Sequence, residues 1–172
     1  MKLFDKLGDK VRDVRTINEL CTGAEGVALR EGAALPGAEH LLAAALALSE
    51  GSARRAFERV GADPDALPAA IAHQHTQALR AIGIEPVPDE LLDPHDGQVT
   101  TPGKGVFRTT ASFQRAFTTA GELARAGDGP LLGAHVVVAV AQIEYGTAPR
   151  ALRAMGIDPA ALAAAAREEA NA

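Results

Sequence analysis

The chain has 172 residues, of which 47% are hydrophobic and only 3% aromatic, and most of the apolar residues are Ala, Leu and Val. This length allows one domain or two small ones with a buried core, and the surplus of Ala and Leu favours helices. The formal net charge is −5 with dispersed Lys and Arg, so the basic patch typical of nucleic-acid binders is missing and we expect no DNA or RNA partner.

Cysteine content and hydropathy indicate where the protein works. The single cysteine, Cys21, cannot form an internal disulfide, so the fold does not require an oxidising compartment. Charged residues interrupt the N-terminus, which therefore lacks the apolar core of a signal peptide. The longest apolar stretch, residues 131–141, is too short to span a bilayer. We expect a cytoplasmic protein with no membrane partner.

The first expected element is an amphipathic helix over residues 1–15. Its apolar side chains recur at helical spacing between charged residues: Leu3, Phe4, Leu7, Val11 and Val14. Such a stripe favours a helix that packs on the following unit. The alternative is a helix that docks a partner or a second copy of the chain.

Residues 16–84 are expected to form a first unit of four helices, near 16–31, 37–49, 52–60 and 64–82. Thr16 and Glu19 have the spacing of a capping box, which predicts a helix start at Thr16. Gly51-Ser52 and Asp63-Pro64 mark later boundaries, because Gly ends helices, Ser and Asp cap them, and Pro fits the first helical position.

Residues 85–106 are predicted to be a linker, because prolines and glycines accumulate there without an apolar period. Residues 107–172 then repeat the first unit, with helices near 109–126, 132–145, 147–155 and 159–169. The β-branched run 136–140 would fit a buried strand on its own. Its counterpart 41–45 is plainly helical, so we predict a helix.

The two units align without a gap when residues 20–71 are compared with residues 115–166, an offset of 95. Several residues, including glycines and an Asp-Pro pair that mark helix boundaries, are identical across this offset. The identical pairs are Gly26 and Gly121, Arg30 and Arg125, Gly32 and Gly127, His40 and His135, Gly51 and Gly146, Arg55 and Arg150, Gly61 and Gly156, Asp63 and Asp158, Pro64 and Pro159, and Leu67 and Leu162. A fixed period is the signature of duplicated structure. The sequence predicts an all-α fold of two pseudo-symmetric four-helix repeats with an extra N-terminal helix.

Three segments carry a family resemblance: Gly37-Ala38-Glu39-His40-Leu41-Leu42, the stretch 51–63 and the stretch 146–158. They resemble the N-terminal domain of ClpC-type Clp (Hsp100) unfoldases, over nearly all of the chain except residues 1–15. The resemblance implies recognition of peptides, protein substrates or adaptors, including proteins marked on phosphorylated arginine. Actinobacterial versions of this domain bind cyclic-peptide antibiotics. The chain is a divergent member, with Ala38 where the family has Thr and Ala134 in place of the second acidic residue.

No Gly-x-x-x-x-Gly-Lys-Ser/Thr motif is present, so the sequence has no phosphate cradle and we expect no ATPase activity and no cofactor. The interpretation is a free-standing Clp N-terminal-like binding module, not an enzyme, that serves as an adaptor, decoy or sequestering protein of the Clp protease system. One alternative is a structural, self-associating helical protein. A less favoured one is a small enzyme that uses Glu39 and His40.

The candidate ligand-binding residues are Glu39, Phe107, Thr109, Phe113 and Phe117. The Glu39 carboxylate lies near an expected helix N-terminus, where it could accept a guanidinium-like donor or merely complement the helix dipole, and both interpretations stay open. Phe113 and Phe117 are four residues apart on one helix face. They could anchor a peptide in a groove, although core packing is the simpler account.

His40 and His135 occupy the same position in the two repeats. Matching histidines suggest metal or acid–base chemistry, but neither has the partner four residues along that a zinc site needs. We therefore expect no metal site and assign both rings a structural role, bonded to backbone. Gly61 and Gly156 are assigned structural roles as well, because each precedes an Asp-Pro helix start.

Overall fold

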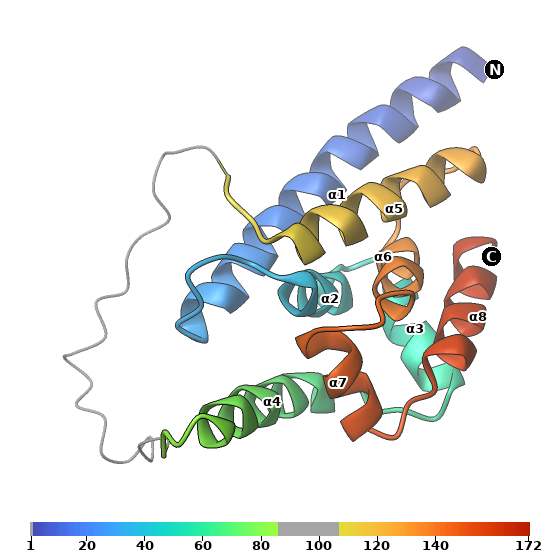
Figure 1. Cartoon of the computed structure of the whole chain (residues 1–172). Coiled ribbons are helices and arrows are strands. Elements are labelled where there is room, and N and C mark those ends of the chain that lie inside the picture. Colours follow the sequence, from blue (N-terminus) through green and yellow to red (C-terminus); the bar gives the residue numbers. More distant parts are fainter. Residues whose placement is uncertain (1, 86–106) are drawn as a thin grey trace.

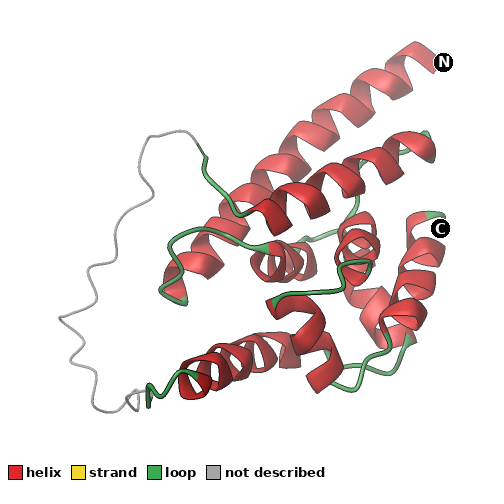
Figure 2. Ribbon diagram, viewed as in Figure 1, coloured by secondary structure: helices red, strands yellow, loops and turns green. Residues whose placement is uncertain are grey.

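The structure, a computed structural model, describes residues 2–85 and 107–172, with side chains from residue 11 onward in the first range. The first repeat contains α1 (Lys2–Arg30), α2 (Ala38–Ala47), α3 (Ser52–Arg59), the short 3-10 helix η1 (Pro64–Ala66) and α4 (Leu67–Ala81). The second contains α5 (Ala111–Ala126), α6 (Gly133–Ala141), α7 (Thr147–Ala154) and α8 (Pro159–Ala170). The described ranges contain helices and loops without any strand (Figure 2), which confirms the all-α prediction. The predicted linker lies outside the described residues, except for Glu85.

The β-branched run of the second repeat is helical, as its counterpart in the first repeat predicted. Residues 133–140 of α6 are all buried, because α2, α3, α5 and α8 pack against this central helix (Figure 1). A helix without a solvent face has no need of an amphipathic pattern, so its sequence can look like that of a buried strand. Among the described helices, none is both long and apolar enough to cross a membrane.

The prediction of a helix start at Thr16 was wrong. Residues 2–30 form a single 29-residue helix, and Thr16 is a buried residue within it. A capping box starts a helix only if the chain before it leaves the helical conformation, and residues 2–15 contain no proline to force that. The amphipathic N-terminal segment is thus the first half of α1, and it projects beyond the rest of the fold (Figure 1).

Other boundaries follow the chemistry of their residues. The Asp158 carboxylate accepts hydrogen bonds from the amides of Ala160 and Ala161 at the start of α8, and the Thr110 hydroxyl accepts one from Phe113 at the start of α5. Such side-chain oxygens satisfy amides that have no partner within the helix. Gly61 and Gly156 have φ angles of +71° and +73°, a left-handed conformation that suits glycine.

The two repeats interlock in one hydrophobic core. Helices α2 and α6 contact each other at the centre, while α3 packs on α8 and α4 packs on α7 (Figure 1). Each repeat therefore completes its packing with helices of the other. The duplication visible in the sequence does not correspond to two separately packed units.

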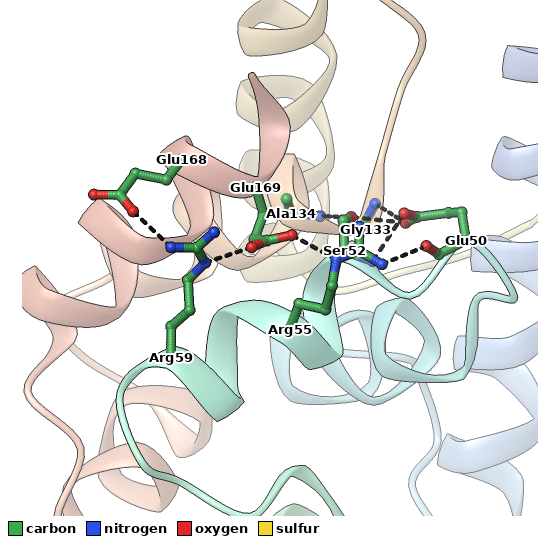
Figure 3. A network of polar contacts seen from close by, with 8 residues as sticks. All are labelled: Glu50, Ser52, Arg55, Arg59, Gly133, Ala134, Glu168 and Glu169. Atoms are coloured by element: carbon green, nitrogen blue, oxygen red, sulfur yellow. Dashed lines mark hydrogen bonds and ion pairs between the residues drawn. The ribbon is translucent and has the colours of Figure 1, made fainter. Parts of the chain in front are cut away.

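The N-terminus of α6 is capped by the opposite repeat (Figure 3). The Glu50 carboxylate accepts a hydrogen bond from the Gly133 amide at 2.7 Å, and the Ser52 hydroxyl accepts one from the Ala134 amide at 2.9 Å. The Ser52 hydroxyl also donates to Glu50 at 2.9 Å. Two amides that α6 cannot satisfy internally are thus bonded by the segment that joins α2 to α3.

A second polar link joins α3 to α8 (Figure 3). The Glu169 carboxylate, only 4% exposed, accepts hydrogen bonds from the guanidinium groups of Arg55 and Arg59, at 2.5 Å from the Nε of Arg55. Hydrogen bonds from Arg55 and then Arg59 hold the pKa of Glu169 below its usual range. Arg59 also pairs with the exposed Glu168 at 2.9 Å.

Replacing Gly133 by Ala should destabilise the protein by about 1–3 kcal/mol, the usual cost of adding a methyl group to a tightly packed site. A Cβ atom there would lie 3.0 Å from the carbonyl oxygen of Ala45 and 2.9 Å from the Glu50 carboxylate. Gly121→Ala in α5 is the matched control, because its Cβ would meet only the Arg125 side chain, at 3.6 Å, and Ala favours helix. Urea unfolding that gives equal midpoints for the two variants would contradict the expected crowding at α6.

Replacing Glu169 by Gln should destabilise the protein at pH 7 by about 1–3 kcal/mol, because two arginines lose a buried charged acceptor. The lowered pKa means that the carboxylate contributes fully above its unfolded pKa of about 4.3, and that the contribution is lost as the pH falls below it. The penalty should therefore shrink between pH 5 and pH 3 in thermal melts. Glu168→Gln, at an exposed ion pair, should cost less than about 0.5 kcal/mol, and an equal loss in both variants would refute the role of Glu169.

Candidate functional site

A groove of about 940 Å³ runs along the first repeat between α1, α2 and α4. Its volume lies within the range of ligand sites. Small or apolar residues make up most of its surface: Gly23, Gly26, Val27, Ala43, Ala44, Ala47, Leu48, Pro68, Ile71 and Ala72. Asn18, Glu19, Thr22, Arg30 and Glu31 add polar groups.

The groove is open because α4 packs against α7 and makes few contacts with α2. In the second repeat the equivalent helix, α8, packs closely along α6. Small residues on the first repeat add to the space. A Cβ atom on Gly23 would lie 3.1 Å from the Cβ of Ala44, so α1 and α2 approach each other closely and neither projects a large side chain there.

The second repeat carries larger side chains at the corresponding positions. Across the offset of 95 residues, Asn18 and Thr22 of the groove correspond to Phe113 and Phe117. The two phenylalanine rings stack with centroids 5.9 Å apart, and Phe113 is only 3% exposed. The second repeat retains a smaller cavity of about 290 Å³.

The structure places the phenylalanines of the sequence-based site in or against the core. Phe113 belongs to the buried cluster, and Phe117 packs partly buried against it. Phe107 is 40% exposed and contacts Phe113 edge to face, with ring centroids 5.6 Å apart. The three rings form one aromatic cluster, and none of them lines the groove.

Glu39 lies at the N-terminus of α2, and its carboxylate is 14% exposed. It folds over Gly37, where a Cβ atom would be 2.6 Å from Oε1. This position suits a negative charge, because the first turn of a helix carries positive potential. Glu39 is not among the residues that line the groove.

The N-termini of α2 and α5 are bonded to each other. Both the amide and the hydroxyl of Thr110 donate to the carbonyl of Pro36, at 3.0 and 3.2 Å. The Ser112 hydroxyl accepts a hydrogen bond from the Ala38 amide at 3.4 Å. The junction brings Glu39 near the segment that contains Thr109, which is half-buried, and the aromatic cluster.

The two histidines that match between the repeats, His40 and His135, are both bonded to backbone. His40 Nδ1 accepts a hydrogen bond from the Gly37 amide at 2.7 Å, and His135 Nδ1 accepts one from the Leu132 amide at 3.1 Å. The ring proton is therefore on Nε2 in each case. In the first repeat this Nε2–H donates to Glu31 Oε2 at 3.0 Å, which fixes Glu31 at one end of the groove.

Neither metal chemistry nor an activated thiol is apparent in the described ranges. No three His, Cys, Asp or Glu side chains there gather closely enough to hold a metal ion. Burial, and secondarily the charge of Glu25, raises the pKa of the Cys21 thiol, which disfavours the reactive thiolate.

The sequence-based reasoning missed the groove residues. One signal could have revealed them, namely the positions where the aligned repeats differ in side-chain size. When the repeats are aligned at the offset of 95 residues, the side chains of the first repeat are smaller at four positions: Asn18 corresponds to Phe113, Thr22 to Phe117, Gly23 to Thr118 and Ala43 to Val138. Smaller side chains at these positions of the first repeat leave room where the second repeat is filled.

Comparison with known proteins agrees with this architecture. The model of the Clp repeat (R) N-terminal domain family matches residues 15–142. The crystal structure of the N-terminal domain of ClpD, a caseinolytic protease associated chaperone from Arabidopsis thaliana, has a similar fold, with a TM-score of 0.55 over 91% of this chain and 90% of that one. The two sequences are 20% identical, so the likeness concerns the fold. No curated protein matches the chain.

Proposed function

Because the chain belongs to the family of the Clp repeat N-terminal domain, we propose that it is a Clp-associated binding module whose first repeat holds a peptide segment of a substrate or adaptor protein in the groove between α1, α2 and α4. The open groove carries the proposal. The activity is binding without ATP hydrolysis, and it suits an adaptor, a decoy or a sequestering protein of the Clp protease system. A cyclic peptide of similar chemistry is an alternative ligand for the same surface.

The shape of the groove favours an apolar segment. Gly and Ala residues of α1 and α2 form much of its lining, so the backbone of a ligand can approach closely while its apolar side chains lie against Val27, Leu48 and Ile71. Burial of that apolar surface supplies the driving force, at roughly 25 cal/mol for each Å² removed from water.

The polar groups favour a basic residue in the ligand. Glu31 lines the groove, and its contacts with His40 and His75 both use Oε2. Among the residues that the structure describes, none bonds Oε1, so this oxygen can accept a donor of the ligand. The net charge of −5 also favours approach by a cationic segment. We therefore propose a ligand that combines apolar side chains with a Lys or Arg directed at Glu31.

Filling the groove should abolish this binding. The double variant Asn18→Phe, Thr22→Phe introduces the residues that the second repeat carries at the equivalent positions, and both sites are exposed, so the fold should be kept. The probe is a phage-displayed library of random linear peptides, selected on the parent protein. Fluorescence anisotropy with the selected peptides should show at least tenfold weaker binding to the double variant.

The matched control is Gln114→Phe, Thr118→Phe, which adds two aromatic residues at exposed positions of α5 away from the groove. It should bind the selected peptides like the parent. Equal affinity of the peptides for the groove-filled variant would overturn the proposed site. A loss confined to Glu39→Ala would instead place the ligand at the junction of α2 and α5, and would also overturn the groove.

A further inference from the structure

The cavity of about 290 Å³ in the second repeat lies where α5, α6 and α8 meet, and we call it the His135 cavity. Ala126, His135, Val138 and Arg167 are among its lining residues. Across the offset of 95 residues, Ala126 corresponds to Glu31 and His135 corresponds to His40. The His135 cavity is thus the second-repeat counterpart of the place where Glu31 meets His40.

The first repeat fills this place with its own carboxylate. Glu31 directly follows the end of α1 and accepts the Nε2–H of His40 at 3.0 Å. The negative potential at a helix C-terminus does not favour a carboxylate, so the buried imidazole donor provides the compensating interaction. In the second repeat Ala126 has no polar side chain, and the imidazole donor is retained.

The His135 ring is held in the same orientation as the His40 ring. In both rings, Nδ1 accepts a hydrogen bond from the backbone amide of the residue three positions earlier. Both rings therefore direct their Nε2–H toward the equivalent position, which is Glu31 in the first repeat and Ala126 in the second. His135 is 7% exposed. Within the described ranges, no acceptor of the chain bonds its Nε2–H, and no fully buried side-chain nitrogen or oxygen there lacks a partner. This donor is therefore open to the cavity, where a ligand can bond it.

Burial favours the neutral form of the His135 ring, and one cation lines the same cavity. Desolvation by burial lowers the pKa of His135, while the carboxylates of Glu50 and Asp13 act in the opposite direction. Those two carboxylates are already bonded to the amides of Gly133 and Leu131. Arg167 of α8 lines the cavity at the position that Ala72 has in the first repeat.

We propose that the His135 cavity binds the carboxylate of a ligand, which accepts the Nε2–H of His135 and pairs with Arg167. The ligand carboxylate would take the position that the Glu31 carboxylate has beside His40 in the first repeat. The ligand class is a carboxylate with a short apolar chain, because Leu123 and Val138 line the same cavity. Two sources have this chemistry, the C-terminus of a peptide that ends in an apolar residue and a free short-chain acid. The site is separate from the groove of the first repeat and does not depend on the proposed function.

The test is an NMR titration of the full chain, with the His135 ring signals as the readout and N-acetylvaline and 3-methylbutyrate as probes. N-acetylvaline carries the carboxylate of a peptide terminus, and its amide, N-acetylvalinamide, is the matched control. A bound carboxylate should shift the His135 signals saturably and raise the pKa of His135, and Arg167→Gln should weaken the binding at least threefold. Tighter binding of N-acetylvaline would assign the site to a peptide terminus, and tighter binding of 3-methylbutyrate to a free acid.

The variant Ala126→Glu supplies the carboxylate from within the chain. It should raise the pKa of His135 in the absence of a probe and weaken probe binding at least tenfold, whereas Ala126→Leu should occupy space without raising that pKa. Equal responses of His135 to N-acetylvaline and its amide, or unchanged probe binding to Ala126→Glu, would overturn the proposal. Absence of a response to either carboxylate would do so as well.

Discussion

The close approach of α6 to the loop between α2 and α3 is the constraint on which the rest of the structure depends. Gly133 has no side chain, so the first turn of α6 can reach the carbonyl of Ala45, and Glu50 and Ser52 then bond its amides. This contact fixes α3 beside α6, where Arg55 and Arg59 can reach Glu169 on α8. One small residue thus allows two copies of a sequence to share a single core.

The same duplicated frame gives two different surfaces. Helix α8 packs along α6, and the phenylalanines of α5 occupy the face that corresponds to the groove. In the first repeat α4 packs against α7, and the small side chains of α1 and α2 leave the groove between α1, α2 and α4 open. The two repeats therefore differ in packing: the second repeat is more completely packed, and the first presents the larger open surface.

Local chemistry was predictable from the sequence, and long-range placement was not. The helix starts at Asp158-Pro159 and the helical state of 136–140 followed from caps and from the internal repeat, because both depend on neighbouring residues or on a counterpart. The continuity of α1 across Thr16 did not follow, since a capping box describes only one side of a boundary. The groove was also missed, because it results from the direction of α4, which contacts between distant helices decide.

The unbroken α1 has a mechanical consequence. The stretch from Asn18 to Arg30 forms one wall of the groove, and the projecting stretch before Thr16 continues the same helix without a hinge. A long helix can curve gently, but a sharp kink needs a proline or another local break. The projecting half therefore leaves the fold in a direction that the groove wall sets, and the hydrogen bond from the Leu131 amide to Asp13 ties its base to the second repeat.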